Sequence, residues 1–70
     1  MGYIKINGNE RGFEAGEFPR TLGALLVVLK VEPATIVAEI DGKIIKREEF
    51  GQTAIREGQS IELVRFVGGG

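Results

Sequence analysis

The sequence has 70 residues, of which 43% are hydrophobic and 27% charged, and its formal net charge is −1. A chain of this length forms one small domain with a narrow margin of stability. The absence of Cys and His excludes disulfides, thiolate or imidazole metal sites and the common nucleophile–base pairs. Nine basic and ten acidic residues are mixed along the chain, which argues against binding to nucleic acid or to an anionic membrane.

The sequence also lacks the signals of membrane insertion, export and calcium binding. No apolar run approaches the roughly 20 residues that cross a bilayer. The segment that follows Met1 does not have the basic stretch and apolar run of a signal peptide. The acidic residues are scattered, without the spacing of a calcium loop. We therefore expect a cytoplasmic protein with no metal site.

The N-terminal segment has the alternating pattern of a β-strand. Over residues 3–7, Ile4 and Ile6 fall on one face and Tyr3 and Lys5 on the other. A strand of this kind covers a hydrophobic core with one face and leaves the other face in solvent.

A hairpin turn and a returning strand are expected next. The pair Asn7-Gly8 suits the positive φ angles of a type I′ turn, which joins two antiparallel strands. The returning strand is predicted over residues 12–15, with Phe13 and Ala15 facing inward.

The clearest pattern in the sequence predicts a helix over residues 22–30. Four leucines recur at helical spacing and form one apolar stripe: Leu22, Leu25, Leu26 and Leu29. Thr21 is a candidate N-cap, because its hydroxyl can accept from backbone N–H groups of the first turn. Pro33 is expected to end the helix.

The second half of the chain predicts three more strands. Residues 35–40 form the first, and Asp41-Gly42 is a two-residue turn into a short strand over residues 43–45. The following segment is polar and has two expected core anchors, Phe50 and Ile55. The last strand is predicted over residues 60–67.

This order of elements predicts an α+β protein with the β-grasp, ubiquitin-like fold. A mixed sheet of about five strands carries one main helix packed on one face, because a single helix can cover only one side. The first and last strands are expected to be neighbours in the middle of the sheet. Residues 1–67 would form the domain and residues 68–70 a flexible Gly-Gly-Gly tail.

Three consecutive glycines are a poor end for a structural strand, because they have no side chains to pack. Fully extended, they span about 10 Å and can bring the Gly70 carboxylate into a narrow active site. Adenylation by ATP would activate that carboxylate, and a sulfur nucleophile could then displace AMP to leave a thiocarboxylate at Gly70. The alternative is that the glycine ending has no function, but a tail without function would usually be longer and more polar.

Four segments resemble the ThiS family of thiamine-biosynthesis sulfur carriers, and together they extend over essentially the whole chain. They are Ile4-Lys5-Ile6-Asn7-Gly8, Thr21-Leu22 through Leu26, Val37-Ala38-Glu39-Ile40-Asp41-Gly42 and Ile61-Glu62-Leu63-Val64-Arg65-Phe66-Val67-Gly68-Gly69-Gly70. The ending from Arg65 to Gly70 is the most specific part.

The resemblance implies a chain that is a protein substrate rather than an enzyme. A ThiF-type adenylating enzyme would use ATP to activate Gly70, and this chain would bind no cofactor itself. A sulfur donor protein would supply the sulfur. The thiocarboxylate would then give its sulfur to a ThiG-type thiazole synthase, for the thiazole ring of thiamine.

A partner-binding surface is expected on the sheet face away from the helix. Alternation in the last strand places Val64 and Phe66 there, with Tyr3 and Lys5 beside them. Aromatic anchors dominate many interfaces, although scattered exposed apolar residues are also normal. We expect the free protein to be a monomer.

Two other functional classes stay open at this point. The chain could be a carrier for molybdopterin or cysteine synthesis, or a ubiquitin-like modifier whose tail joins lysines. The small subunit of molybdopterin synthase usually has Pro-rich residues before its Gly-Gly, where this chain has Phe66-Val67, which favours the thiamine branch. It could also be a non-catalytic β-grasp binding module.

Overall fold

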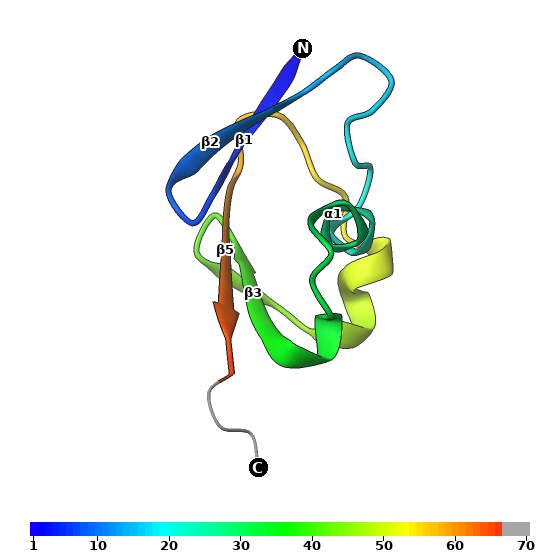
Figure 1. The fold of residues 1–70 in the computed structure, drawn as a ribbon. Helices are drawn as coiled ribbons and strands as arrows, with labels where there is room; N and C mark the ends of the chain where they lie inside the picture. Colours follow the sequence, from blue (N-terminus) through cyan, green and yellow to red (C-terminus); the bar gives the residue numbers. More distant parts are fainter. Residues whose placement is uncertain (67–70) are drawn as a thin grey trace.

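The computed structural model describes residues 1–66 of the chain (Figure 1). Its elements, in chain order, are β1 (Gly2–Ile6), β2 (Asn9–Phe13), α1 (Leu22–Leu29), η1 (Pro33–Thr35), β3 (Ile36–Ile40), β4 (Lys43–Ile45), η2 (Arg47–Gln52) and β5 (Ser60–Arg65), where η1 and η2 are 3₁₀ helices. The predicted tail, residues 68–70, and the last residue of the predicted domain lie outside the described residues. Among residues 1–66, no helix is both long and apolar enough to cross a membrane.

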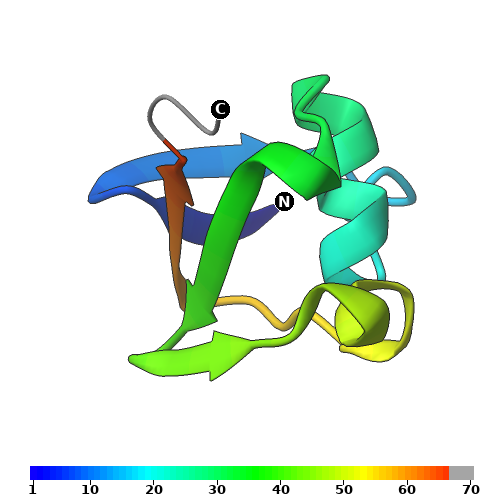
Figure 2. The same ribbon diagram turned by 90° about the horizontal axis from the view of Figure 1, so that it is seen from below.

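The five strands form one mixed sheet in the order β2-β1-β5-β3-β4. The β1–β5 pair is parallel and the other three pairs are antiparallel. The first and last strands are therefore neighbours, and β5 lies in the centre, as predicted. Figure 2 shows the sheet curving around one side of the molecule, with α1 and η2 on the other. This arrangement confirms the predicted α+β architecture.

The core lies between α1 and the concave face of the sheet. Its buried residues are Ile4, Phe13, Leu22, Leu25, Leu26, Ile36, Ala38, Ile40, Phe50, Ile55 and Ile61. Leu29 is partly buried and packs against this cluster, so all four predicted leucines face the core. Phe50 and Ile55 anchor the polar segment, also as predicted. Removing this much apolar surface from water is the main stabilising contribution to the fold.

The first hairpin differs from the prediction in the position of its second strand. Asn7 and Gly8 have φ angles of 51° and 84°, as a type I′ turn requires. This two-residue turn places Asn9 directly opposite Ile6, so β2 begins at once and ends at Phe13. The prediction that Ala15 faces inward is wrong, because the strand has ended before it and its side chain is exposed.

The helix begins as predicted but ends for a different reason. The backbone N–H of Ala24 donates to the Thr21 hydroxyl at 3.1 Å, so Thr21 is the N-cap. At the other end, Lys30 adopts a left-handed conformation with φ 60° and closes the helix. Pro33 does not end the helix but opens η1, where its fixed φ and missing N–H are tolerated. Since η1 includes Thr35, β3 begins one residue later than predicted.

Candidate functional site

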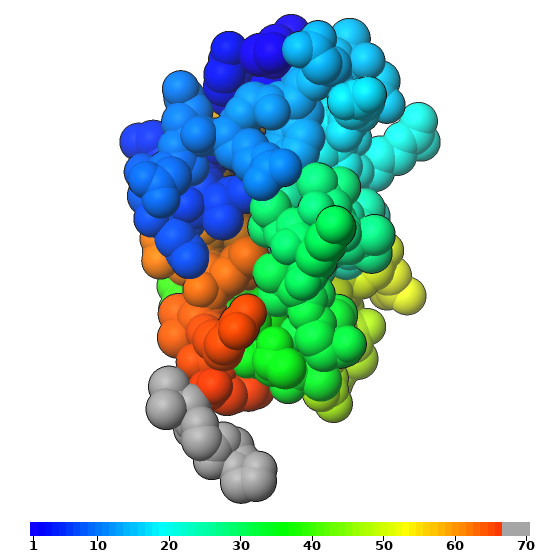
Figure 3. Space-filling model, viewed as in Figure 1, coloured from blue at the N-terminus to red at the C-terminus, as the bar shows by residue number. Residues whose placement is uncertain are grey.

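The structure describes the end of the strand that precedes the predicted Gly-Gly-Gly tail. β5 runs through the centre of the sheet, and after it the backbone N–H of Phe66 donates to Thr35 O at 2.8 Å. Figure 3 shows this red end of the described chain on the surface, beside the green segment that holds η1 and the start of β3. Gly68, Gly69 and Gly70 lie outside the described residues, so their predicted role stays a prediction.

Alternation along β5 directs two apolar side chains away from the helix. Ile61 is fully buried on the inner face, whereas Val64 and Phe66 on the outer face are 57% and 54% exposed. Tyr3 and Lys5 of β1 are also exposed on the outer face. All four residues predicted for partner binding therefore lie on the same face of the sheet.

The structure does not bring these four residues together. Gly58 donates its backbone N–H to Tyr3 O at 2.8 Å, and Lys5 is in register with Ser60. Val64 lies four residues beyond Ser60, which is roughly 13 Å along a strand that rises about 3.3 Å per residue. The prediction that Tyr3 and Lys5 lie beside Val64 and Phe66 is thus wrong, because parallel pairing places them near the opposite end of β5.

Two apolar residues that the sequence analysis missed do lie near Val64 and Phe66. Val37 of β3 is directly opposite Val64, and Ile44 of β4 is 64% exposed on the outer face. We call these four residues, Val37, Ile44, Val64 and Phe66, the outer patch. Val37 follows the buried Ile36, so strand alternation places it on the outer face. The sequence does not show this, because neighbouring residues of β3 are both apolar and β-branched. β4 is too short to show an alternation of its own.

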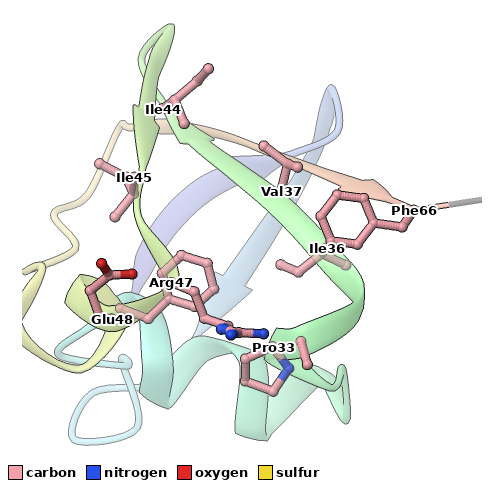
Figure 4. A pocket seen from close by; sticks show the side chains of 10 residues that line it. Pro33, Ile36, Val37, Ile44, Ile45, Arg47, Glu48 and Phe66 are labelled. Carbon is pink, nitrogen blue, oxygen red and sulfur yellow. The ribbon is translucent and has the colours of Figure 1, made fainter. Parts of the chain in front are cut away.

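A groove of about 390 Å³ continues the outer patch around the edge of the sheet. It is lined by Pro33, Ala34, Ile36, Val37, Ile44, Ile45, Arg47, Glu48, Phe50 and Phe66. Figure 4 shows Val37 between Ile44 and Phe66 along the groove. The groove exists because β4 pairs only with the second half of β3 and leaves its first residues uncovered.

A second hollow, of about 430 Å³, lies on the inner side at the end of β5. Its lining residues are Ile6, Asn7, Leu29, Val31, Ile36, Leu63 and Arg65. It opens where α1 and β1 have ended while β5 continues. The last residues of β5 therefore lie between an apolar groove on one side and a hollow on the other.

The outer face also carries a pair of like charges. Glu39 and Glu62 are directly opposite each other on β3 and β5. Among residues 1–66, no group of three or more acidic side chains is placed to hold a metal ion. The chemistry available on this face is therefore apolar contact and surface charge.

Two solved structures are closely similar to this fold. A crystal structure of a thiamine biosynthesis protein (ThiS) from Geobacter metallireducens is 29% identical, with a TM-score of 0.82. The alignment covers 97% of this chain and 99% of that one. A solution NMR structure of a thiamine biosynthesis protein from the same organism is 31% identical, with a TM-score of 0.76, and covers 100% of this chain and 88% of that one.

Two curated relatives are thiazole synthases. The protein from Paramagnetospirillum magneticum is 37% identical over 67 residues, and the protein from Magnetococcus marinus is 34% identical over 67 residues. Both alignments cover 96% of this chain but only 20% of the relative. The chain thus spans about a fifth of the length of the curated relatives it matches.

The family comparison covers nearly all of the sequence. The model of the ThiS family matches residues 4–70, a span that begins within β1 and includes the outer patch and the glycine ending. The β-grasp architecture agrees with the two solved structures at high TM-scores. On this evidence the chain belongs to the ThiS family.

Proposed function

We propose that this chain is a sulfur carrier protein in thiamine biosynthesis, and that it carries sulfur as a thiocarboxylate at Gly70. The observation that carries the proposal is the ThiS family match over residues 4–70, which includes the glycine ending. The two structural neighbours, both thiamine biosynthesis proteins, support the same pathway. The position of β5 fits this role, since a strand with a neighbour on each side fixes the point from which the residues leading to Gly70 follow.

The chemistry begins with a carboxylate, which resists nucleophiles because of its negative charge and poor leaving group. A Gly70 carboxylate oxygen attacks the α-phosphorus of ATP and pyrophosphate leaves, which gives an acyl adenylate. Hydrosulfide then attacks the acyl carbon and AMP leaves, which gives the thiocarboxylate. If the sulfur arrives as a protein persulfide, an acyl disulfide forms first and a second thiol must cleave it. The proposal requires Gly70 to carry a free carboxylate.

The catalytic groups for these steps would come from partner proteins. The sequence has no Cys or His to act as nucleophile or base. We assign ATP binding to a ThiF-type adenylating enzyme, sulfur delivery to a sulfur donor protein and sulfur use to a ThiG-type thiazole synthase. The two thiazole synthase relatives favour that last partner. In this proposal the chain is a cytoplasmic protein, a monomer when free, with no bound cofactor.

The outer patch is the proposed docking surface for these partners. Phe66 is its aromatic member, lies next to the reactive end in sequence and is more than half exposed. Large aromatic side chains often provide most of the binding energy at the centre of an interface. Tyr3 and Lys5 lie near the other end of β5 and would contact a partner only at the rim.

An adenylation assay tests the proposed function. The purified chain is mixed with the adenylating enzyme and ATP, and pyrophosphate release is measured beside a variant that lacks Gly70. We expect release with the full chain and none with the shortened one. Release that does not depend on Gly70 would contradict the assignment of the reacting group. No release, from an enzyme active on its own carrier, would favour the molybdopterin, cysteine, modifier or binding-module alternatives.

A further inference from the structure

We propose that Asn7 is a positioning residue for the reacting end of the chain. Its side-chain amide holds the backbone of Leu63 and so fixes the last part of β5, from which the residues leading to Gly70 follow. This inference rests on the proposed function, because Asn7 would act only through the placement of that end.

The amide of Asn7 replaces a missing stretch of strand. β1 pairs with β5 only at Lys5–Ser60 and Ile6–Ile61, and the chain then turns away at Asn7. The backbone N–H of Asn7 still donates to Ile61 O at 2.8 Å. Further along β5, Leu63 donates its N–H to Asn7 Oδ1 at 2.7 Å, and Asn7 Nδ2 donates to Leu63 O at 3.2 Å. One side chain thus bonds both backbone groups of Leu63.

The end of β5 depends on these bonds because little else holds it on that side. Figure 1 shows β5 extending past the β1–β2 hairpin. On its other edge, Leu63 is paired with Ala38 of β3. The hollow of about 430 Å³ is lined by Leu63 and Arg65, so side-chain packing on the inner face leaves open space there. Hydrogen bonds at the two edges, together with the packing of Leu63 against the core, therefore determine where this part of the strand lies.

Only asparagine meets both requirements at position 7. The φ angle of 51° is left-handed, a conformation in which Gly, Asn and Asp are the most common residues. The Asn side chain offers a donor and an acceptor together. Gly would keep the turn but lose both bonds. Asp would keep the acceptor but place a second acceptor against the carbonyl oxygen of Leu63.

The chain contains a matched control at its second hairpin turn. Asp41 also has a φ of 51° and is followed by a glycine with a φ of 84°, like Asn7 and Gly8. Its Oδ1 accepts from the backbone N–H of Ser60 at 2.9 Å. Asp41→Gly therefore removes a side-chain bond to the same strand from the same kind of turn, but at the start of β5 rather than near its reactive end.

The test compares adenylation of the wild-type chain with that of Asn7→Gly, Asn7→Asp and Asp41→Gly. The values of kcat and KM are measured with the adenylating enzyme, below the unfolding midpoint of every variant, and amide hydrogen exchange is followed at Leu63. We expect a roughly tenfold lower kcat in both Asn7 variants, because a small misplacement of a reacting group slows a reaction strongly. Exchange at Leu63 should be fastest in Asn7→Gly, which removes the acceptor of the Leu63 N–H. It should also be faster than wild type in Asn7→Asp, because repulsion between the carboxylate and the carbonyl oxygen of Leu63 weakens the same bond. KM should rise as well, because the same part of the chain carries Val64 and Phe66 of the outer patch. Asp41→Gly should react like the wild type.

Other results would overturn either the role of Asn7 alone or the proposed function together with it. Faster exchange at Leu63 with an unchanged kcat would overturn the role of Asn7. An equal loss of kcat in Asn7→Gly and Asp41→Gly would assign the effect to stability and overturn it too. If Asn7→Gly does not fold, Asn7→Asp gives the same comparison with the side chain kept. A wild-type chain that is not adenylated would overturn the proposed function, and the role of Asn7 with it.

Discussion

Gly23 of α1 and Gly51 of η2 lie so close that a Cβ atom at Gly23 would be 3.3 Å from Gly51 Cα. This approach explains a glycine inside a helix, where it is about 1 kcal/mol less favourable than Ala. It also lets η2 insert Phe50 into the core while Arg47 and Glu48 line the groove. The contact between α1 and η2 thus links the core to the edge of the outer patch.

Gly23→Val should destabilise the protein, because its side chain would push against the backbone of η2. Overpacking of this kind costs roughly 1–3 kcal/mol, measured as the free energy of unfolding in urea. Gly51→Ala is the matched control from the same contact, since a Cβ at Gly51 meets nothing within 4 Å. We expect that control to be neutral or slightly stabilising. Equal losses in the two variants would contradict the close approach.

Lys30→Gly should stabilise the protein, because Lys30 closes the helix with a φ of 60°. A left-handed conformation costs about 1–2 kcal/mol for a residue with a Cβ, and Gly removes this cost. Part of the resulting stabilisation is lost because Gly has a greater conformational entropy in the unfolded chain. The expected net gain is roughly 0.5–1 kcal/mol in a denaturant titration. Lys30→Ala, which removes the charge but keeps a Cβ, should show no such gain. A loss of stability in Lys30→Gly would refute this explanation.

Glu62→Gln should also stabilise the protein, since it removes the repulsion between Glu62 and Glu39 across β5 and β3. Cross-strand pairs of this kind differ by roughly 0.2–1 kcal/mol. The gain should be largest at low salt and shrink as salt is added, because Glu62 is exposed and Glu39 is only half-buried. A gain of the same size at all salt concentrations would point to a cause other than charge.

Phe66→Ala should weaken docking without unfolding the protein. Its side chain is 54% exposed, so truncation should lower the free energy of unfolding by no more than about 1 kcal/mol. We expect KM for the adenylating enzyme to rise roughly tenfold, which corresponds to about 1.4 kcal/mol of lost binding. Tyr3→Ala removes an exposed aromatic near the other end of β5 and is the control. If Tyr3→Ala raises KM as much as Phe66→Ala, the docking surface is not the outer patch.

Much of the fold could be predicted because its main signals are local. The leucine stripe of α1, the Thr21 cap and the two glycine turns each depend on residues adjacent in sequence or one helical turn apart. The errors arose where a neighbouring element of the fold determines where a strand or helix ends. Ala15 faces solvent because the first turn fixes where β2 begins, and the strand ends before Ala15. Lys30 ends the helix in a left-handed conformation, which cannot be predicted from a Lys in the sequence.

The candidate site could be predicted only in part, for the same reason. Alternation identified Val64 and Phe66 as exposed, but their neighbours Val37 and Ile44 follow from strand register between distant segments. Register also separates Tyr3 from Val64. The bonds from Asn7 to Leu63 join residues that are far apart in sequence, so no local pattern marks them.

Intact mass spectrometry tests directly the claim that Gly70 becomes a thiocarboxylate. The wild-type chain is incubated with the adenylating enzyme, ATP and a sulfur source, beside the variant that lacks Gly70. We predict a mass increase equal to the exchange of one oxygen atom for sulfur, in the wild-type chain alone. An unchanged wild-type mass, with an enzyme that modifies its own carrier under the same conditions, would contradict the claim.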